Sequence, residues 1–115
     1  MTTRQEKIQE LLREEISDIL RREFKDPRLG FITITGAEVT SDLRHAKVFV
    51  SVLGTEQQRE ENIAILKKGE HFVRAALGRR IHMKTLPEID FRLDTSADKG
   101  IRIQELLEQI KHDED

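Results

Sequence analysis

Residues 62–94 constrain the fold of this chain most, because two helical patterns and a strand pattern follow one another there. The first helical pattern stops at Gly69, since glycine in a helix interior costs about 1 kcal/mol relative to alanine. The second begins near Phe72, and residues 89–94 then alternate apolar and charged side chains, as a strand with one buried face does. Residues 71–86 contain four basic side chains and no acidic one, in a chain of net charge −2. This combination predicts a small α/β module that contacts a polyanion.

The composition favours one globular domain spanning residues 1–115. Charged residues make up 37% of the chain and there is no cysteine, which excludes thiol catalysis, thiolate metal sites and disulfides. No apolar run approaches the roughly 20 residues of a membrane span, and the N-terminus lacks the apolar segment of a signal peptide. We therefore expect a cytoplasmic protein that does not bind membranes.

The first helix is predicted over residues 5–24, where apolar side chains recur at three- and four-residue spacings on one face. Thr3, with Glu6 three positions later, is typical of a capping box at a helix start. Pro27 prevents the helix from continuing, and the residue before a proline is disfavoured in helical conformation.

Two strands are predicted next, over residues 31–40 and 46–52. Gly36 interrupts the first strand, and a glycine inside a strand pattern most often marks a bulge. Residues 41–44 have the composition of a turn. The short link makes the two strands an antiparallel hairpin.

The rest of the chain is predicted to form helices over residues 56–68 and 70–83, a strand over 87–94 and a C-terminal helix with an acidic tail over about 97–115. Thr55 is the expected cap of the first of these helices. A three-stranded sheet with helices on one face accommodates this order as a two-layer α+β domain.

Several motifs narrow this prediction to a family. The motifs are Asp26-Pro27-Arg28-Leu29-Gly30, then Val39-Thr40-Ser41-Asp42-Leu43-Arg44-His45-Ala46-Lys47-Val48-Phe49-Val50-Ser51, then Phe72-Val73-Arg74-Ala75-Ala76-Leu77-Gly78, and Pro87-Glu88-Ile89-Asp90-Phe91. In this order, over almost the whole chain, they resemble the bacterial ribosome-binding factor A family, whose fold is a KH-like domain of type II topology.

The resemblance implies a ribosome-assembly factor without enzymatic activity. The absence of cysteine and of a sustained heptad favours a monomer without metal or cofactor. The partners that the resemblance implies are the free 30S small ribosomal subunit and 16S rRNA, whose late maturation the family assists, and the family is tied to growth in the cold. Ordinary KH domains hold a nucleic-acid backbone with a Gly-x-x-Gly loop between two helices, and this family has an Ala-x-Gly kink there. The matching residues here are Gly69-Glu70-His71, which keep a break but depart from that kink at both ends.

A helical wheel divides residues 70–83 into an apolar side, which carries Phe72, and an open side, which carries Arg74 and Arg79. At about 100° per residue, Ala75 and Gly78 leave the middle of the open side nearly bare. A phosphate backbone could approach closely there, with arginines as bidentate clamps. Arg80 falls on the apolar side instead, so we expect it to pair with a carboxylate or to extend along the surface. The predicted RNA-binding residues are Lys67, Lys68, Gly69, His71, Arg74, Gly78, Arg79, His82 and Lys84.

Other interpretations remain open at this point. A basic helix face is often only solvated, and Phe49, with Phe31 beside it, could instead stack bases on the sheet. We expect the C-terminal helix to cover Phe49. A different class of function is a protein-interaction adaptor, whose acidic tail and charged first helix bind a basic partner. The histidines show no metal-ligand spacing and no group of catalytic residues stands out, so we expect neither a metal site nor an enzyme.

Overall fold

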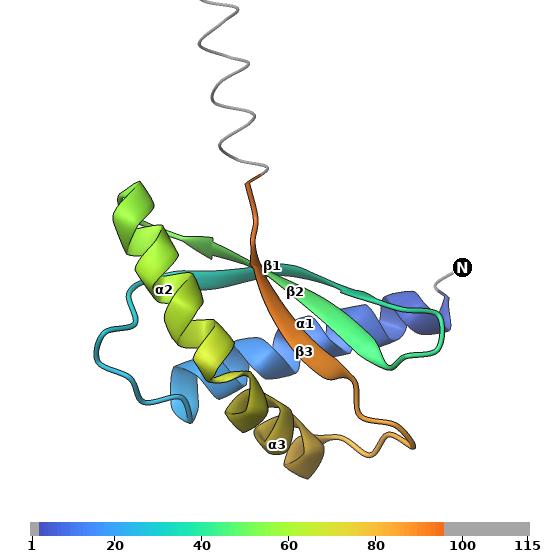
Figure 1. Ribbon diagram of the computed structural model, residues 1–115. Coiled ribbons are helices and arrows are strands. Elements are labelled where there is room, and N and C mark those ends of the chain that lie inside the picture. Colours follow the sequence, from blue (N-terminus) through green and yellow to red (C-terminus); the bar gives the residue numbers. More distant parts are fainter. Residues whose placement is uncertain (1–2, 96–115) are drawn as a thin grey trace, which may run out of the picture.

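The computed structural model describes residues 3–95, which run in the order helix, strand, strand, helix, helix, strand (Figure 1). The elements are α1 Arg4–Arg22, β1 Ile32–Val39, β2 His45–Val52, α2 Glu56–Lys68, α3 Glu70–Arg80 and β3 Glu88–Leu93. The strands form one sheet in the order β1-β2-β3, with β1 antiparallel and β3 parallel to the central β2. The predicted α+β fold with type II KH-like topology is confirmed.

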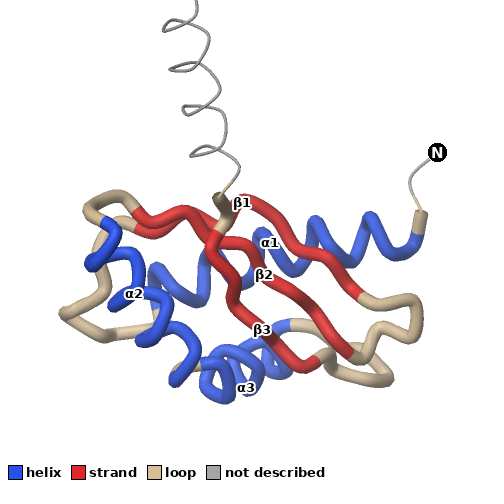
Figure 2. Tube along the Cα trace, turned by 45° about the horizontal axis from the view of Figure 1, so that its top comes forward, coloured by secondary structure: helices blue, strands red, loops and turns tan. Residues whose placement is uncertain are grey.

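The side-chain alternation of the strands gives the sheet one covered face and one open face. Ala46, Val48 and Val50 of β2 are buried, whereas the residues between them are exposed or half-buried. Figure 2 shows α1 behind the sheet, on the covered face, with α2 and α3 towards the β3 side. The core between these layers is aliphatic apart from Phe91, which is fully buried on β3. Full burial of such a side chain stabilises the fold by roughly 1.5–3 kcal/mol.

Helix α1 begins as the sequence predicts and ends slightly earlier. The Thr3 hydroxyl accepts a hydrogen bond from the Glu6 amide (3.1 Å), which is the N-cap half of the predicted capping box. The helix ends at Arg22, and the chain turns so that the Phe24 amide donates to the carbonyl of Ile19 (3.0 Å). Phe24 therefore lies beyond the helix that the sequence assigned to it, and its ring reaches a different part of the fold.

The β1–β2 hairpin contains the predicted bulge. The pairing register shifts between Ile34 and Gly36, and Gly36 then lies opposite Phe49. In the turn, Leu43 has a φ of 61°, a left-handed conformation that side chains rarely adopt. The Asp42 carboxylate stabilises this turn because it accepts hydrogen bonds from the Thr40 hydroxyl (2.6 Å) and the Arg44 amide (3.1 Å).

Helix α2 begins with a full capping box, in which Thr55 and Gln58 bond each other's backbone amides. Helix α3 is shorter than predicted, because Ile81 is already extended, with φ −126° and ψ 143°. His82 and Lys84 consequently lie in the loop that leads to β3 rather than on the helix. The predicted C-terminal helix and tail lie outside the described residues.

Candidate nucleic-acid interface

Gly69 forms the predicted break, since it ends α2 and also precedes α3. Its amide donates to the carbonyls of Ile65 (3.1 Å) and Leu66 (3.0 Å), and its own carbonyl accepts from the Val73 amide (3.0 Å). With φ −89° and ψ 3°, the backbone does not require glycine. Space favours it: a Cβ at this position would lie 2.7 Å from Cζ of the Phe24 ring, which would have to shift. The ring of Phe24, which follows α1 in the chain, therefore occupies the space that a side chain at position 69 would need.

Most of the predicted RNA-binding residues lie on the outer surface of α3 or next to one of its ends. The exposed residues there are Lys67, Lys68, His71, Phe72, Ala75, Gly78, Arg79, His82 and Lys84. Within residues 3–95, Lys68, His71, His82 and Lys84 have no ion pair or side-chain hydrogen bond, whereas Lys67 pairs with Asp90 on β3 (3.0 Å). We call this set of exposed residues the α3 surface.

A shallow hollow lies at the C-terminal end of the α3 surface. It is lined by Gly78, Ile81, His82, Met83, Lys84 and Leu86. A Cβ at Gly78 would lie 3.2 Å from a methyl carbon of Leu86, so glycine keeps the hollow open and the backbone close to its floor. The predicted bare patch is present, since Ala75 and Gly78 are both exposed, and a lysine and a histidine line the hollow beside it.

Arg74 does not point to the open side, and the prediction of its orientation is wrong. Its guanidinium donates to the backbone carbonyls of Leu86 (2.8 Å) and Pro87 (3.1 Å), and the side chain is half-buried. One helical turn earlier, the Glu70 carboxylate accepts a hydrogen bond from the Phe91 amide (2.8 Å). The long side chain of Arg74 lets it reach the loop before β3, so Glu70 and Arg74 together attach α3 to β3 and its preceding loop.

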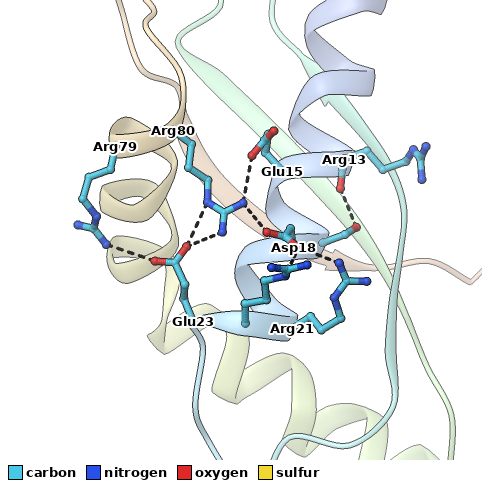
Figure 3. Close-up of polar contacts among 9 residues, drawn as sticks. Arg13, Glu15, Asp18, Arg21, Glu23, Arg79 and Arg80 are labelled. Carbon is cyan, nitrogen blue, oxygen red and sulfur yellow. Dashed lines mark hydrogen bonds and ion pairs between the residues drawn. The ribbon is translucent and has the colours of Figure 1, made fainter.

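Arg80 pairs with carboxylates, as predicted (Figure 3). Its guanidinium lies against α1 and the residue after it, 2.7 Å from Asp18, 2.7 Å from Glu23 and 3.1 Å from Glu15. Hydrogen bonds that Arg80 donates to these three carboxylates raise its pKa, and the one to Asp18 lowers the pKa of that carboxyl. The positive charge of Arg80 is thus neutralised within the fold.

Arg79 remains on the α3 surface, although it also lies near Glu23. Its guanidinium is 3.8 Å from that carboxylate, which already bonds Arg80 at shorter distance. The side chain is 64% exposed. Exposed pairs of this kind contribute at most about 1 kcal/mol, so Arg79 can turn to another anion at little cost.

The open face of the sheet carries aromatic and basic side chains beside carboxylates. Phe49 is half-buried, and its cross-strand neighbours are Gly36 on one side and Arg92 on the other. The next pair of positions places Lys47 between Glu38 and Asp90, so carboxylates flank the lysine on both strands. Phe31 is 83% exposed and lies at the end of the sheet beside Leu53, whose amide bonds its carbonyl (3.2 Å). Whether residues after Thr95 cover Phe49 stays a prediction.

Sequence reasoning missed two aromatic residues at the break. Phe24 was assigned to the stripe of α1, yet its ring contacts Gly69 and stands edge-on to Phe72, with ring centroids 5.8 Å apart. Phe72 was assigned to the apolar side of α3, yet 43% of it is exposed. Spacing along a helix could not reveal either contact, because both depend on how the chain turns after Arg22.

Two kinds of feature, a metal-binding group and a membrane-spanning helix, are absent from the described part of the chain. No group of three or more histidine and acidic side chains among residues 3–95 is arranged to hold a metal ion. In the same range, no helix is both long and apolar enough to cross a bilayer.

Comparison with known proteins agrees with the resemblance noted in the sequence. The family model described as ribosome-binding factor A matches residues 4–107. Ribosome-binding factor A of Desulforamulus reducens is 46% identical over 114 residues, covering 99% of this chain and 95% of that protein. The Halothermothrix orenii protein is 50% identical over 112 residues, covering 97% of this chain and 92% of the relative.

Solved structures show the same fold. A Thermotoga maritima ribosome-binding factor A structure in solution has a TM-score of 0.69 at 31% identity, over 75% of this chain and 82% of that one. A homology model of the Thermus thermophilus protein, fitted into a cryo-EM map of its complex with 30S, has a TM-score of 0.63 at 25% identity, over 76% and 91% of the two chains. The sequence match extends over nearly all of the chain and the fold match over about three quarters of it. The chain therefore belongs to the ribosome-binding factor A family.

Proposed function

We propose that this chain binds the free 30S small ribosomal subunit through 16S rRNA, with the α3 surface as its main contact, and assists late maturation of that RNA. The observation that carries the proposal is the placement of two lysines without a partner among residues 3–95 at the two ends of the α3 surface. Lys68 precedes α3, and Lys84 lies beyond its other end, where it lines the hollow beside Gly78. Cationic side chains around a bare backbone suit a phosphate chain. The Thermus relative fitted into a 30S complex supports the same partner.

The structure weakens the adaptor interpretation. That interpretation requires acidic side chains of α1 to be available to a basic partner, but Glu15 and Asp18, with Glu23 after the helix, are already engaged by Arg80. An outside partner would have to compete with a guanidinium fixed in place by the fold. We also propose that the activity is binding rather than catalysis. The proposed protein is a single cytoplasmic domain that includes residues 96–115, and it supports growth in the cold.

Co-sedimentation with ribosomal particles tests this function. The protein is expected to migrate with free 30S subunits and not with translating ribosomes. Reversing two charges of the α3 surface, Lys68→Glu with Lys84→Glu, should weaken binding and flatten its dependence on salt. If each lysine neutralises one phosphate, the log–log slope falls by about 1.4 to 1.8 units.

The matched control makes the same charge change elsewhere. Lys7→Glu with Lys47→Glu alters the start of α1 and the open face of the sheet, both exposed. It should reduce affinity much less than the α3 variant. Equal losses would mean that overall charge, not the α3 surface, governs binding. A stronger loss in the control would place the main contact on α1 or on the open face of the sheet. In cells lacking the factor, the α3 variant should also fail to reduce the accumulation of precursor 16S rRNA.

A further inference from the structure

Phe72 is a large apolar side chain left partly open on the proposed RNA surface. It lies on α3 one turn after Gly69, and 43% of it remains exposed. Its partner Phe24 meets it in a T-shaped arrangement, with an angle of 69° between the ring planes. Aromatic pairs prefer this geometry. Because the Phe24 ring in turn fills the space beside Gly69, the contact fixes Phe72 in position while leaving part of its surface to solvent.

The surroundings of Phe72 combine bare backbone and positive charge. Helical spacing places Phe72, Ala75 and Arg79 in one row, at positions i, i+3 and i+7. Ala75 and Arg79 are both exposed. Lys25 follows Phe24 in sequence, Lys68 precedes the break, and neither has an ion pair within residues 3–95.

We propose that Phe72 is a stacking platform for an unpaired base of the bound RNA, an inference that rests on the proposed function. A base stacks on an aromatic ring through its face, and a neighbouring cation can then hold the phosphate that follows. Arg79, in the same row beyond the bare Ala75, can take that phosphate. Bases inside a duplex cannot present a face to the ring, so this subsite selects a single-stranded segment.

The absence of tryptophan and tyrosine from the chain permits a direct test. Phe72→Trp introduces the only indole, and its fluorescence should be quenched when a short unstructured RNA, of roughly 10 nucleotides, binds. The matched control is Phe31→Trp on the open face of the sheet, a position that is 83% exposed. The control should not respond. Quenching in the control but not at position 72 would overturn the proposal, and so would failure of the wild-type protein to bind the short RNA.

Binding measurements separate stacking from charge. Phe72→Leu keeps an apolar contact with Phe24 but removes the ring, and it should lower affinity for the unstructured RNA by roughly 5- to 150-fold, the equivalent of one stacked base. The salt slope should stay unchanged because no phosphate contact is lost, whereas Lys68→Ala should reduce it by about 0.7. Phe24→Leu removes the supporting ring but keeps the platform, so it should weaken binding less than Phe72→Leu.

The outcome also distinguishes failure of the subsite from failure of the proposed function. Wild-type affinity in Phe72→Leu, or a Phe24→Leu variant that loses as much as Phe72→Leu, would overturn the stacking platform while co-sedimentation with 30S subunits stood. A wild-type protein that does not co-sediment with 30S subunits at all would refute the function itself.

Discussion

Replacing Gly69 by alanine tests the close meeting of α2 and α3. The backbone at Gly69 suits any residue, so alanine should gain about 0.4–1 kcal/mol from the lower entropy of the unfolded chain. The new methyl group, however, would lie 2.7 Å from Cζ of Phe24, well inside van der Waals distance. Overpacking of this kind costs about 1–3 kcal/mol. The net expectation is a destabilisation of at most about 2.6 kcal/mol.

Urea denaturation measures this difference, and a double-mutant cycle assigns its cause. Gly69→Ala should lower the urea midpoint at unchanged m-value. In a Phe24→Leu background, where a smaller side chain can move away, the same substitution should cost little or become stabilising. The coupling energy between the two sites should then be about 0.5–3 kcal/mol. If Gly69→Ala stabilises the wild-type protein, or if its effect is the same in both backgrounds, the steric explanation of the break is refuted.

Three further predictions concern other parts of the fold. Arg74→Ala removes two charge-assisted hydrogen bonds to the loop before β3 and should lower the free energy of unfolding by about 1–3 kcal/mol. The control Arg79→Ala, on the same helix, should change it by less than about 0.5 kcal/mol. Equal effects in thermal melts would contradict the different roles assigned to the two arginines. Hydrogen bonds from Arg28 hold the pKa of the Asp26 carboxyl at about 2, below its usual 3.8. The stability that this carboxylate supplies is therefore complete above about pH 4 and is lost as the pH falls through 2. Over this range, the urea midpoint of Asp26→Asn should fall less steeply with pH than that of the wild-type protein. The chain is expected to be a monomer that needs no metal, so analytical ultracentrifugation should show one species at micromolar concentration and a chelator should leave the Tm unchanged.

The sequence predicted the elements well because their signals are local. The cap at Thr3, the bulge at Gly36 and the break at Gly69 each depend on residue types within a few positions, and all three are present. The ends of the helices were less accurate, with α1 ending at Arg22 and α3 at Arg80. Side-chain spacing continued beyond both ends, although the backbone had already left the helix.

The site was predicted less completely, because angular position on a helix does not fix where a long side chain ends. Arg80 was placed correctly, since a charge within the apolar arc must find a carboxylate. Arg74 lay near the boundary of that arc, where its guanidinium could reach either solvent or the loop before β3. Which of these occurs depends on the path of residues 81–87, and no pattern in the sequence describes that path. The Phe24 contact was missed for the same reason, since it joins residues 45 and 48 positions apart.

The hydrogen bond between Glu70 and the Phe91 amide gives the protein a built-in reporter. Most strand amides are protected from exchange with solvent by a neighbouring strand, but this amide is protected by a side chain of α3. Its exchange rate therefore measures how often helix and strand separate, apart from any opening of the sheet itself. A ligand that binds the outside of α3 and makes this separation rarer should lower the exchange rate of the Phe91 amide. NMR at this amide can therefore detect RNA binding on the opposite side of the helix.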